Sequence, residues 1–400
     1  MIKEWRKGGK SLFGADKSAL QKAEGAFCFY IIETEIVKFR ERNLLANQRF
    51  AVEILKFRLS IVVIIKQVEV SIMIKIVIDT KGADKGAATL IKGVAMALEK
   101  FPEAGYLLVG DEAYIREECE ALGLPMDRVE ILDAPEEITN YDNPAEAVFT
   151  KRDSSMIRSL EALSKREDLF GYLTAGSTGA LLVGAMRYLP RKTRVRPALA
   201  ALLPSQNGGF TCVVDTGATV DCTPEMLHHF ARLGREFMME VYGIENARIG
   251  LLSNGAEEGK GNALVKATFP LLKEDEALNF IGNVEGRDAL SGVCDVLVCD
   301  GFAGNQVLKV TEGTAKRIIT DVVKYARKTG SEDVMGLVKQ LLAIYDMESL
   351  GGANLLGVSK PCVKMHGSCT EKTVVSSTEM LLNIASNKAV FEKDKYTIKI

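Results

Sequence analysis

The sequence predicts an α/β protein in which three layers, helix, sheet and helix, enclose a mostly parallel sheet. From Met73 onward, short apolar runs alternate with helical stretches, and Asp, Asn or Gly follows most of the apolar runs. This alternation is typical of βαβ units, whose strands are buried on both faces and read as continuous apolar segments. The expected strands are 74–78, 106–109, 129–132, 171–174, 211–214, 248–252, 279–282 and 295–299.

Composition indicates a compact enzyme with reduced cysteines. The chain has 400 residues, 47% hydrophobic and 26% charged, which is enough for a large core in one domain or in two to three smaller ones. A formal net charge of −2 gives no electrostatic footprint for nucleic acid. The eight cysteines form no CxxC pair and there are only three histidines, so we expect neither a disulfide framework nor a metal site.

The first 72 residues differ in charge from the remainder. They hold 13 Lys/Arg against 8 Asp/Glu, whereas residues 73–400 hold 38 against 45. Charged residues interrupt their apolar runs, which fits neither a signal peptide nor a membrane span. We therefore expect 1–72 to be a non-native or poorly ordered extension, and 73–400 to form the α/β domain, with a helical excursion near 306–348.

The segment 248–262 combines a strand, a polar turn and a helix start. Asn254 ends the apolar run, and in 259–262 the residues Gly259, Lys260, Gly261 and Asn262 bring backbone N–H groups, an ammonium and a carboxamide to one place. Such a group can bind an oxyanion before a helix begins. A nucleotide-binding P-loop is disfavoured, because it needs four residues between its glycines and Ser or Thr after the Lys. A glycine-rich turn with a solvated Lys explains the segment equally well.

A second small-residue turn covers residues 174–180, ahead of another helical pattern. Ser177, Thr178 and Gly179 allow a ligand to approach the backbone closely and suit anion contact at the helix N-terminus, although an ordinary helix cap has the same composition. No GxGxxG follows any expected strand, so the usual dinucleotide fingerprint is absent.

Two further groups of polar residues follow apolar runs. Asp300, two glycines, Asn305 and Lys309 make a second polar cradle at a strand end, with a fold-stabilising turn as the competing explanation. His366 comes after the apolar stretch 359–365 and precedes Gly367 and Ser368. A lone histidine is usually structural, so a functional role for His366 depends on the other motifs of the chain.

Taken in order, nine segments resemble the PlsX family of acyl-ACP:phosphate acyltransferases in bacterial phospholipid synthesis. The resemblance spans roughly residues 73–386, and nine motifs in the family's order are far more specific than any single one. The segments are 152–156, 175–180, 196–199, 215–222, 243–246, 257–262, 280–285, 300–305 and 366–368.

The resemblance implies a fold similar to isocitrate and isopropylmalate dehydrogenases and a cytoplasmic homodimer. It implies transfer of a long acyl chain from acyl carrier protein (ACP) to inorganic phosphate, forming an acyl phosphate for phospholipid synthesis. A peripheral membrane contact through a helical hairpin fits the apolar spacing of 334–345, which a core-facing helix explains equally well. No cofactor is expected, because the thioester is already activated and phosphate is largely dianionic.

The chemistry then requires alignment and charge stabilisation. We expect Lys260, Asn262 and the backbone of Gly259 and Gly261 to hold phosphate. In the same hypothesis, Asn254 and Asn305 donate hydrogen bonds to the carbonyl or phosphate oxygens, and Lys309 neutralises negative charge. Asp300 would orient a lysine or accept the phosphate proton, and His366 would act as a general acid or base or as an orienting residue.

The chain also departs from the family pattern. The turn 79–84 reads DTKGAD where the family usually has DAMGGD, and Ser177 and Thr219 each replace a usual Asn. We expect Lys81, a bulky cation in this turn, to alter the grip on substrate. Two other functions stay open: a short-chain phosphotransacylase that uses acyl-CoA, and a non-catalytic dimeric scaffold at the membrane surface.

Overall fold

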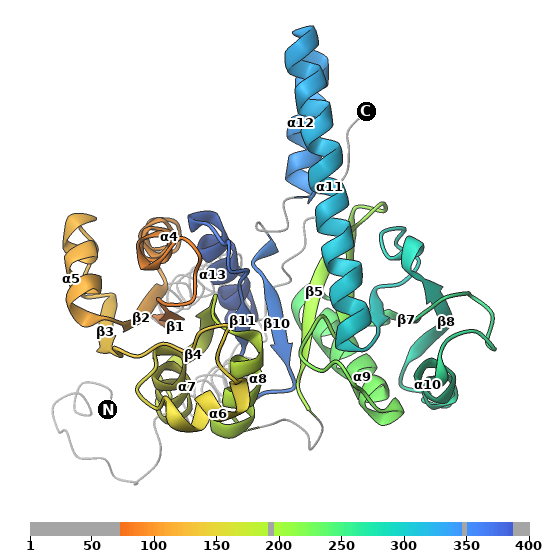
Figure 1. The fold of residues 1–400 in the computed structure, drawn as a ribbon, viewed down its shortest axis with the longest axis horizontal. Helices are drawn as coiled ribbons and strands as arrows, with labels where there is room; N and C mark the ends of the chain where they lie inside the picture. Colours follow the sequence, from red (N-terminus) through yellow and green to blue (C-terminus); the bar gives the residue numbers. More distant parts are fainter. Residues whose placement is uncertain (1–72, 191–195, 346–349, 387–400) are drawn as a thin grey trace, which may run out of the picture. The chain divides into compact units, whose positions relative to one another are not determined.

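The computed structural model describes residues 73–190, 196–345 and 350–386, all within one compact unit, Ile72–Ile400. The expected extension 1–72 lies outside the described residues, as do residues 346–348 at the end of the expected helical excursion and 191–195 and 387–400 of the expected α/β domain. One sheet of eleven strands forms the middle layer, in the order β3-β2-β1-β4-β11-β10-β5-β6-β9-β7-β8 (Figure 1). The strands are β1 Ile74–Asp79, β2 Ala104–Gly110, β3 Val129–Asp133, β4 Leu169–Thr174, β5 Ala198–Ser205, β6 Gly209–Val214, β7 Arg248–Ser253, β8 Asn279–Glu285, β9 Val296–Val298, β10 Ala353–Leu356 and β11 Cys362–Lys364.

The sheet consists of two parallel halves that run in opposite directions. In one half β3, β2, β1, β4 and β11 pair in parallel, and in the other β6, β9, β7 and β8 do so. Between them, β10 and β5 pair antiparallel with each other and with their outer neighbours. Because of these three antiparallel steps, the strands of the two halves approach from opposite directions, and the carboxyl ends of β4, β11, β6, β9 and β7 meet in one row across the sheet.

The eight expected strands all coincide with observed ones, and the α/β class with a mostly parallel sheet is confirmed. The three strands that the sequence did not indicate, β5, β10 and β11, are the ones that join the halves. β5 is fully buried, and its sequence ALAALLPS has no alternation that would distinguish a strand from a helix. β10 and β11 have four and three residues, which is too short for a periodic signal.

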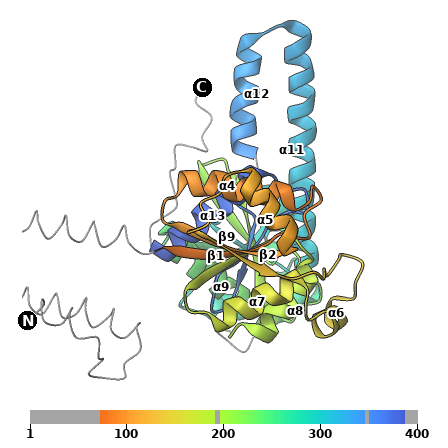
Figure 2. The same ribbon diagram turned by 90° about the vertical axis from the view of Figure 1, so that its left-hand side faces the viewer.

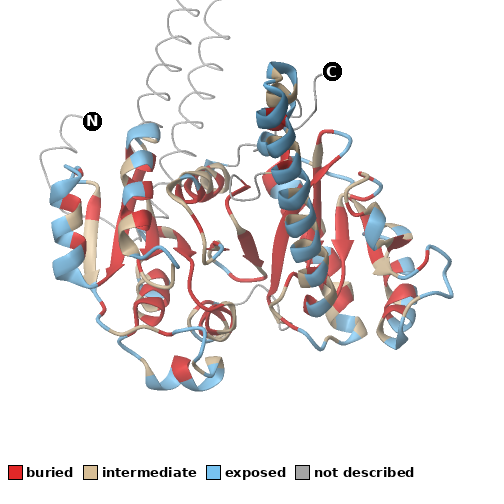
Figure 3. Cartoon of the chain, turned by 45° about the horizontal axis from the view of Figure 1, so that its top comes forward, coloured by how far each residue is buried: buried red, intermediate tan, exposed pale blue. Residues whose placement is uncertain are grey.

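Helices cover both faces of the sheet (Figure 2). In the first half, α4, α5 and α13 pack in one apolar cluster and α6, α7 and α8 in another, on the opposite face. In the second half, α9 and α10 cover one face. Buried residues are concentrated along the strands (Figure 3). The bounds are α4 Ala87–Lys100, α5 Glu112–Ala121, α6 Pro144–Thr150, α7 Ser155–Lys165, α8 Thr178–Tyr188, α9 Pro224–Tyr242, α10 Ala263–Lys273, the short η1 Gly286–Asp288, and α13 Glu371–Ser386.

Two further helices form a hairpin that extends beyond the sheet (Figures 1 and 2). α11, Gly301–Thr329, begins after β9, and its first turns pack over β5 and β6; α12, Glu332–Tyr345, returns beside it. α11 is the longest described helix, at 29 residues. Among the described residues, none of the helices combines the length and apolarity needed to cross a bilayer.

Candidate functional site

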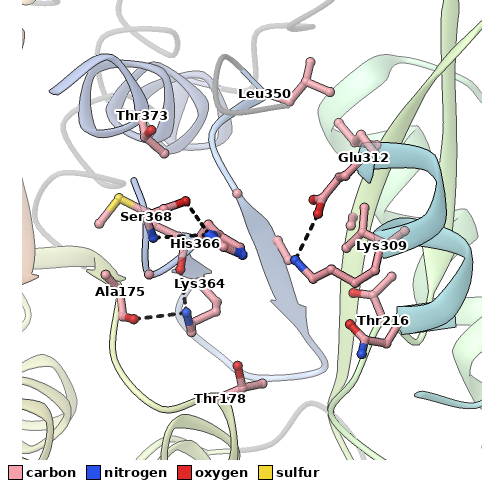
Figure 4. A pocket seen from close by; sticks show the side chains of 18 of the residues that line it. Ala175, Thr178, Thr216, Lys309, Glu312, Leu350, Lys364, His366, Ser368 and Thr373 are labelled. Carbon is pink, nitrogen blue, oxygen red and sulfur yellow. Dashed lines mark hydrogen bonds and ion pairs between the residues drawn. The ribbon is translucent and has the colours of Figure 1, made fainter. Parts of the chain in front are cut away.

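A cavity of about 860 Å³ is lined by the ends of β4 and β11, the central strands β10 and β5, and the helices α11 and α12 (Figure 4). Its size falls in the range of ligand sites, roughly 300–1,000 Å³. Its apolar lining includes Leu199, Leu308, Ile319, Leu342, Tyr345 and Leu350. Its polar lining includes Thr178, Thr216, Asn305, Lys309, Lys364 and His366. The cavity therefore suits a ligand with a long apolar part and an anionic or hydrogen-bonding head.

Four of the site residues expected from sequence line this cavity: Thr178, Asn305, Lys309 and His366. They come from three parts of the chain, namely the start of α8, the first turns of α11 and the segment after β11. The other expected residues lie beside the cavity or on another loop. Their roles remain predictions.

The turn before α8 is fixed by hydrogen bonds from its own side chains. The hydroxyl of Thr174 accepts a hydrogen bond from the Gly176 amide over 3.0 Å and donates to the buried Asp79 carboxylate, also over 3.0 Å. Ser177 caps α8 through a long contact of 3.5 Å with the Ala180 amide. A Cβ at Gly179 would lie 2.8 Å from Cγ of Pro144, so the position has no room for a side chain. Ser177 and Gly179 thus shape the turn that presents Thr178.

The Lys260 loop, residues 254–262 between β7 and α10, lies outside the cavity lining. Oδ1 of Asn254 accepts a hydrogen bond from the Gly261 amide over 2.8 Å, and Oδ1 of Asn262 accepts one from Val265 over 2.9 Å. Gly261 has a φ of 101°, in the region that favours glycine. The carboxamide oxygens of Asn254 and Asn262 therefore brace the loop, and their NH₂ groups are the parts left for a ligand.

Lys260 is exposed, and no ion pair holds its ammonium among the described residues. Its aliphatic stem passes beside Gly255, where a Cβ would lie 2.8 Å from Cγ of the lysine. The Asn283 carboxamide donates to the carbonyl oxygen of Glu257 over 2.8 Å and holds the middle of the loop. The loop is thus braced at two points while its cation stays free for an anion.

Strand pairing explains where this loop lies relative to the cavity. β7 runs parallel to β9 and opposite to β4 and β11, and the pairing registers between them place the carboxyl ends of these strands in one row across the sheet. Leu251 pairs with Val298, so the Lys260 loop begins beside the residues that start α11. Asn305, four residues into that helix, is the expected site residue that lies between the start of the Lys260 loop and the cavity.

Asp300 is the N-cap of α11, which agrees with the fold-stabilising turn that was the competing explanation for this segment. Its carboxylate accepts a hydrogen bond from the Ala303 amide over 2.8 Å, and it does not line the cavity. The neighbouring buried carboxylate of Asp215 accepts from four backbone amides, including Leu199 at 3.0 Å and Thr219 at 2.7 Å. Burial raises the pKa of Asp215, while these amides act in the opposite direction. Both carboxylates therefore organise the backbone around Asn305.

His366 faces the cavity as a neutral ring with a defined tautomer. Its Nδ1 receives the Ser368 amide over 3.2 Å and lies 2.7 Å from the Ser368 hydroxyl (Figure 4). Partial burial, and then the charge of Lys309, lower the pKa of His366 below its ordinary value. Because Nδ1 accepts a hydrogen bond, the ring proton is on Nε2, and near neutral pH His366 is a donor from that atom.

Lys364 lines the cavity, but it was not among the site residues predicted from the sequence. It is the last residue of β11, and its Nζ donates to the carbonyl oxygens of Ala175, over 3.1 Å, and Met365 (Figure 4). Burial lowers its pKa to about 8. The signal available in the sequence was a Lys within the apolar run that leads to His366, but β11 was too short to be expected as a strand.

Lys81 lies outside the cavity lining. Its ammonium donates to the carbonyl oxygen of Pro135 over 2.7 Å, and its amide donates to Asp79 over 3.0 Å. The same turn contacts the His366 segment, because the Asp84 amide donates to the carbonyl oxygen of Gly367 over 2.7 Å. The turn 79–84 therefore supports the cavity wall, and the bulk of Lys81 is directed elsewhere.

Comparison with known proteins agrees with this architecture. Residues 74–390 match the family model described as "Fatty acid synthesis protein". A phosphate acyltransferase of Halothermothrix orenii is 39% identical over 323 residues, covering 79% of this chain and 96% of that protein. One from Caldanaerobacter subterraneus subsp. tengcongensis is 41% identical over 320 residues, covering 78% and 94%.

A solved structure shows the same fold at much lower identity. The phosphotransacetylase from Streptococcus pyogenes superposes with a TM-score of 0.52 at 14% identity, covering 78% of this chain and 94% of that one. The family model, in contrast, extends from the first residue of β1 to beyond α13, and the two relatives are matched over nearly their whole length. The resemblance carried by the nine motifs is confirmed, and the chain belongs to the family of fatty acid synthesis proteins that includes these phosphate acyltransferases.

Proposed function

We propose that this protein transfers a long-chain acyl group from acyl-ACP to inorganic phosphate and so forms an acyl phosphate for phospholipid synthesis. Family membership makes it an enzyme of the acyltransferase class. The observation that carries the proposal is the double character of the cavity, in which Ile319 and Leu350 on one part and Lys309 and Lys364 on another suit an acyl chain and an anionic head. A short acyl group would leave the apolar lining unfilled.

In the proposed reaction, a phosphate oxygen attacks the carbonyl carbon of the thioester. A C–O bond forms, the C–S bond breaks, and the carrier leaves as a thiol that takes up the proton lost by the attacking hydrogen phosphate. Lys260, with Asn262 and the amides of Gly259 and Gly261, would hold phosphate beside the start of α11. Asn305 would donate to the carbonyl oxygen as it gains negative charge, and such preorganised donors supply much of the rate in acyl transfer.

The neutral tautomer narrows the role of His366 within this proposal. With Nδ1 occupied by the Ser368 amide, the Nε2–H group can donate to an oxyanion or to the departing sulfur but cannot accept a proton there. We therefore propose His366 as a donor, with Lys309 nearby to neutralise charge. Lys309 itself is paired with Glu312 at 3.0 Å.

The proposal includes a cytoplasmic homodimer with a peripheral membrane contact through the α11–α12 hairpin. Supporting it, Val310, Ile318 and Tyr325 of α11 expose 64%, 54% and 59% of their surface. Such side chains suit a second subunit or the interface of a bilayer. Light scattering and flotation with anionic vesicles, each compared with a variant carrying Ile318→Ser and Tyr325→Ser, would test the two contacts separately.

The reaction is tested with purified protein, palmitoyl-ACP and phosphate. We expect release of the ACP thiol and an acyl phosphate that hydroxylamine traps as hydroxamate, with phosphate obligatory and neither ATP nor NAD required. Faster turnover of acetyl-CoA or butyryl-CoA than of palmitoyl-ACP would support the short-chain phosphotransacylase instead. If folded protein forms hydroxamate no faster than a sample without enzyme, for both carriers and all chain lengths, both enzyme hypotheses are wrong and the non-catalytic scaffold is the hypothesis that is left.

A further inference from the structure

The cavity lining has more positively than negatively charged side chains. Its lining contains Lys309, Lys316 and Lys364 but a single carboxylate, Glu312, which is paired with Lys309. Within the described part of the chain, no carboxylate lies in ion-pair distance of the Lys364 ammonium. A protein with a net charge of −2 thus concentrates positive charge in this cavity.

Lys364 is held in place while one of its donors stays available. An ammonium has three N–H donors, and the carbonyl oxygens of Ala175 and Met365 take two of them. The remaining donor belongs to a side chain that lines the cavity. Removing a cation from water without a counter-charge is costly, and the lowered pKa of Lys364 reflects that cost. The position therefore favours an anionic ligand over an empty site.

The groups around Lys364 are mainly donors. Thr178, at the N-terminus of the eleven-residue helix α8, and the Nε2–H group of His366 line the same cavity. Ala175, whose carbonyl binds the ammonium, belongs to the turn that leads into α8. Donors from three parts of the chain, one of them a cation, match an oxyanion with several acceptor oxygens.

We infer that Lys364, with Thr178 and His366, binds the oxyanion of a phosphate group, at a site separate from the Lys260 loop. The inference rests on the proposed function for its choice of ligands. Two sources offer this chemistry: inorganic phosphate, and the phosphodiester at the end of the pantetheine arm that carries an acyl thioester. Because Lys260 does not line the cavity, a phosphate on Lys364 and a phosphate on the Lys260 loop are compatible with one reaction.

Binding without turnover tests the inference, and the chain offers a matched control. Nζ of Lys360, before β11, also donates to two carbonyl oxygens, those of Arg166 at 2.8 Å and Leu169 at 2.7 Å, but Lys360 does not line the cavity. The proteins to compare are the parent, Lys364→Gln and Lys360→Gln. Each is titrated calorimetrically with inorganic phosphate, with 4′-phosphopantetheine and with pantetheine, which lacks the phosphate.

We expect Lys364→Gln to weaken one phosphate-bearing ligand by roughly 10- to 100-fold, the scale of one charge-assisted hydrogen bond, while Lys360→Gln binds like the parent. A loss for inorganic phosphate identifies the acceptor as the source. A loss for 4′-phosphopantetheine but not for pantetheine identifies the carrier arm. If Lys364→Gln matches Lys360→Gln for all three ligands, the inference is overturned, even where the parent still forms acyl phosphate.

The parent protein decides the question if the Lys364 variant does not fold. Amine labelling followed by mass spectrometry should modify Lys364 in the ligand-free protein and several-fold less with saturating phosphate or 4′-phosphopantetheine, with Lys360 as internal reference. Labelling that neither ligand reduces contradicts the inference. So does a Lys364 that is never labelled, because the site requires an ammonium reachable from the cavity.

Discussion

The ammonium of Lys364 donates a hydrogen bond of 3.1 Å to the carbonyl oxygen of Ala175, so the end of β11 is tied to the turn that precedes α8. The two residues are 189 positions apart. They meet because β11 pairs in parallel with β4, with Lys364 opposite Thr174. This pairing brings the His366 segment against the first half of the sheet, across the cavity from α11.

Replacing Lys260 with alanine should impair the use of phosphate without affecting the fold. We expect a higher KM for phosphate or a lower kcat by roughly 10- to 1,000-fold, the scale of one lost charge-stabilising contact. Because the side chain is exposed, the unfolding temperature should stay unchanged. Lys266→Ala, on the exposed face of α10, is the control. Kinetics indistinguishable between the two variants would remove Lys260 from the site.

Asn305→Ala should lower kcat more than it raises either KM. If the carboxamide stabilises the oxygen that gains charge in the transition state, its loss should cost on the order of 10²–10³ in kcat. Gln306→Ala, at the next and exposed position of α11, should behave like the parent. Steady-state kinetics with palmitoyl-ACP would show the difference, and a rise in KM at unchanged kcat would contradict the role.

The activity should fall as the pH rises above about 8, because burial lowers the pKa of Lys364 to about 8 and the neutral amine holds an anion poorly. Below that pH the ammonium is charged and the site is complete. Lys309 opposes the charged form of Lys364, and Asp84 and Asp79 favour it. Arginine keeps its charge throughout this range, so Lys364→Arg should move the alkaline limb upward. The test is kcat/KM from pH 6.5 to 9.5, corrected for thioester hydrolysis; an unmoved limb would assign it to another group.

Two glycines of α11 should respond in opposite ways to alanine. A Cβ at Gly304 would lie 1.9 Å from the carbonyl oxygen of Asp215, so Gly304→Ala should destabilise the fold by about 1–3 kcal/mol or more. Gly313 is exposed, with no atom near its Cβ position, so Gly313→Ala should stabilise the fold by about 0.5–1 kcal/mol. Urea unfolding of both proteins measures the contrast, and equal shifts would refute the close approach at Gly304.

A chain that begins at Met73 should fold and dimerise unaided. The family match starts at residue 74, and β1, which begins there, pairs with both β2 and β4. Thermal unfolding and mass by light scattering, compared with the full chain, provide the measurement. An insoluble or monomeric protein would show that residues 1–72 contribute to the folded state.

The amino-acid sequence by itself determined the local elements and most of the polar turns between them. Apolar runs such as 74–78 and 248–252 became β1 and β7 because burial on both faces of a sheet demands uninterrupted hydrophobic side chains. The turns after them could also be read, since Asn254, Gly261 and Asn262 fix a loop through contacts within a few residues of one another. The residues that fix the Lys260 loop are close together in the sequence, so the sequence alone could predict this loop.

Only the tertiary structure decided the direction of the strands and hence which residues meet. β10 and β11, short segments near the end of the chain, insert between β4 and β5. β5 still runs parallel to β4, and the second half is reversed by the antiparallel pairing of β5 with β6. The pairing of β11 with β4 places Lys364 opposite Thr174. This contact depends on pairing between segments nearly two hundred residues apart, and no local pattern of side chains encodes such a pairing.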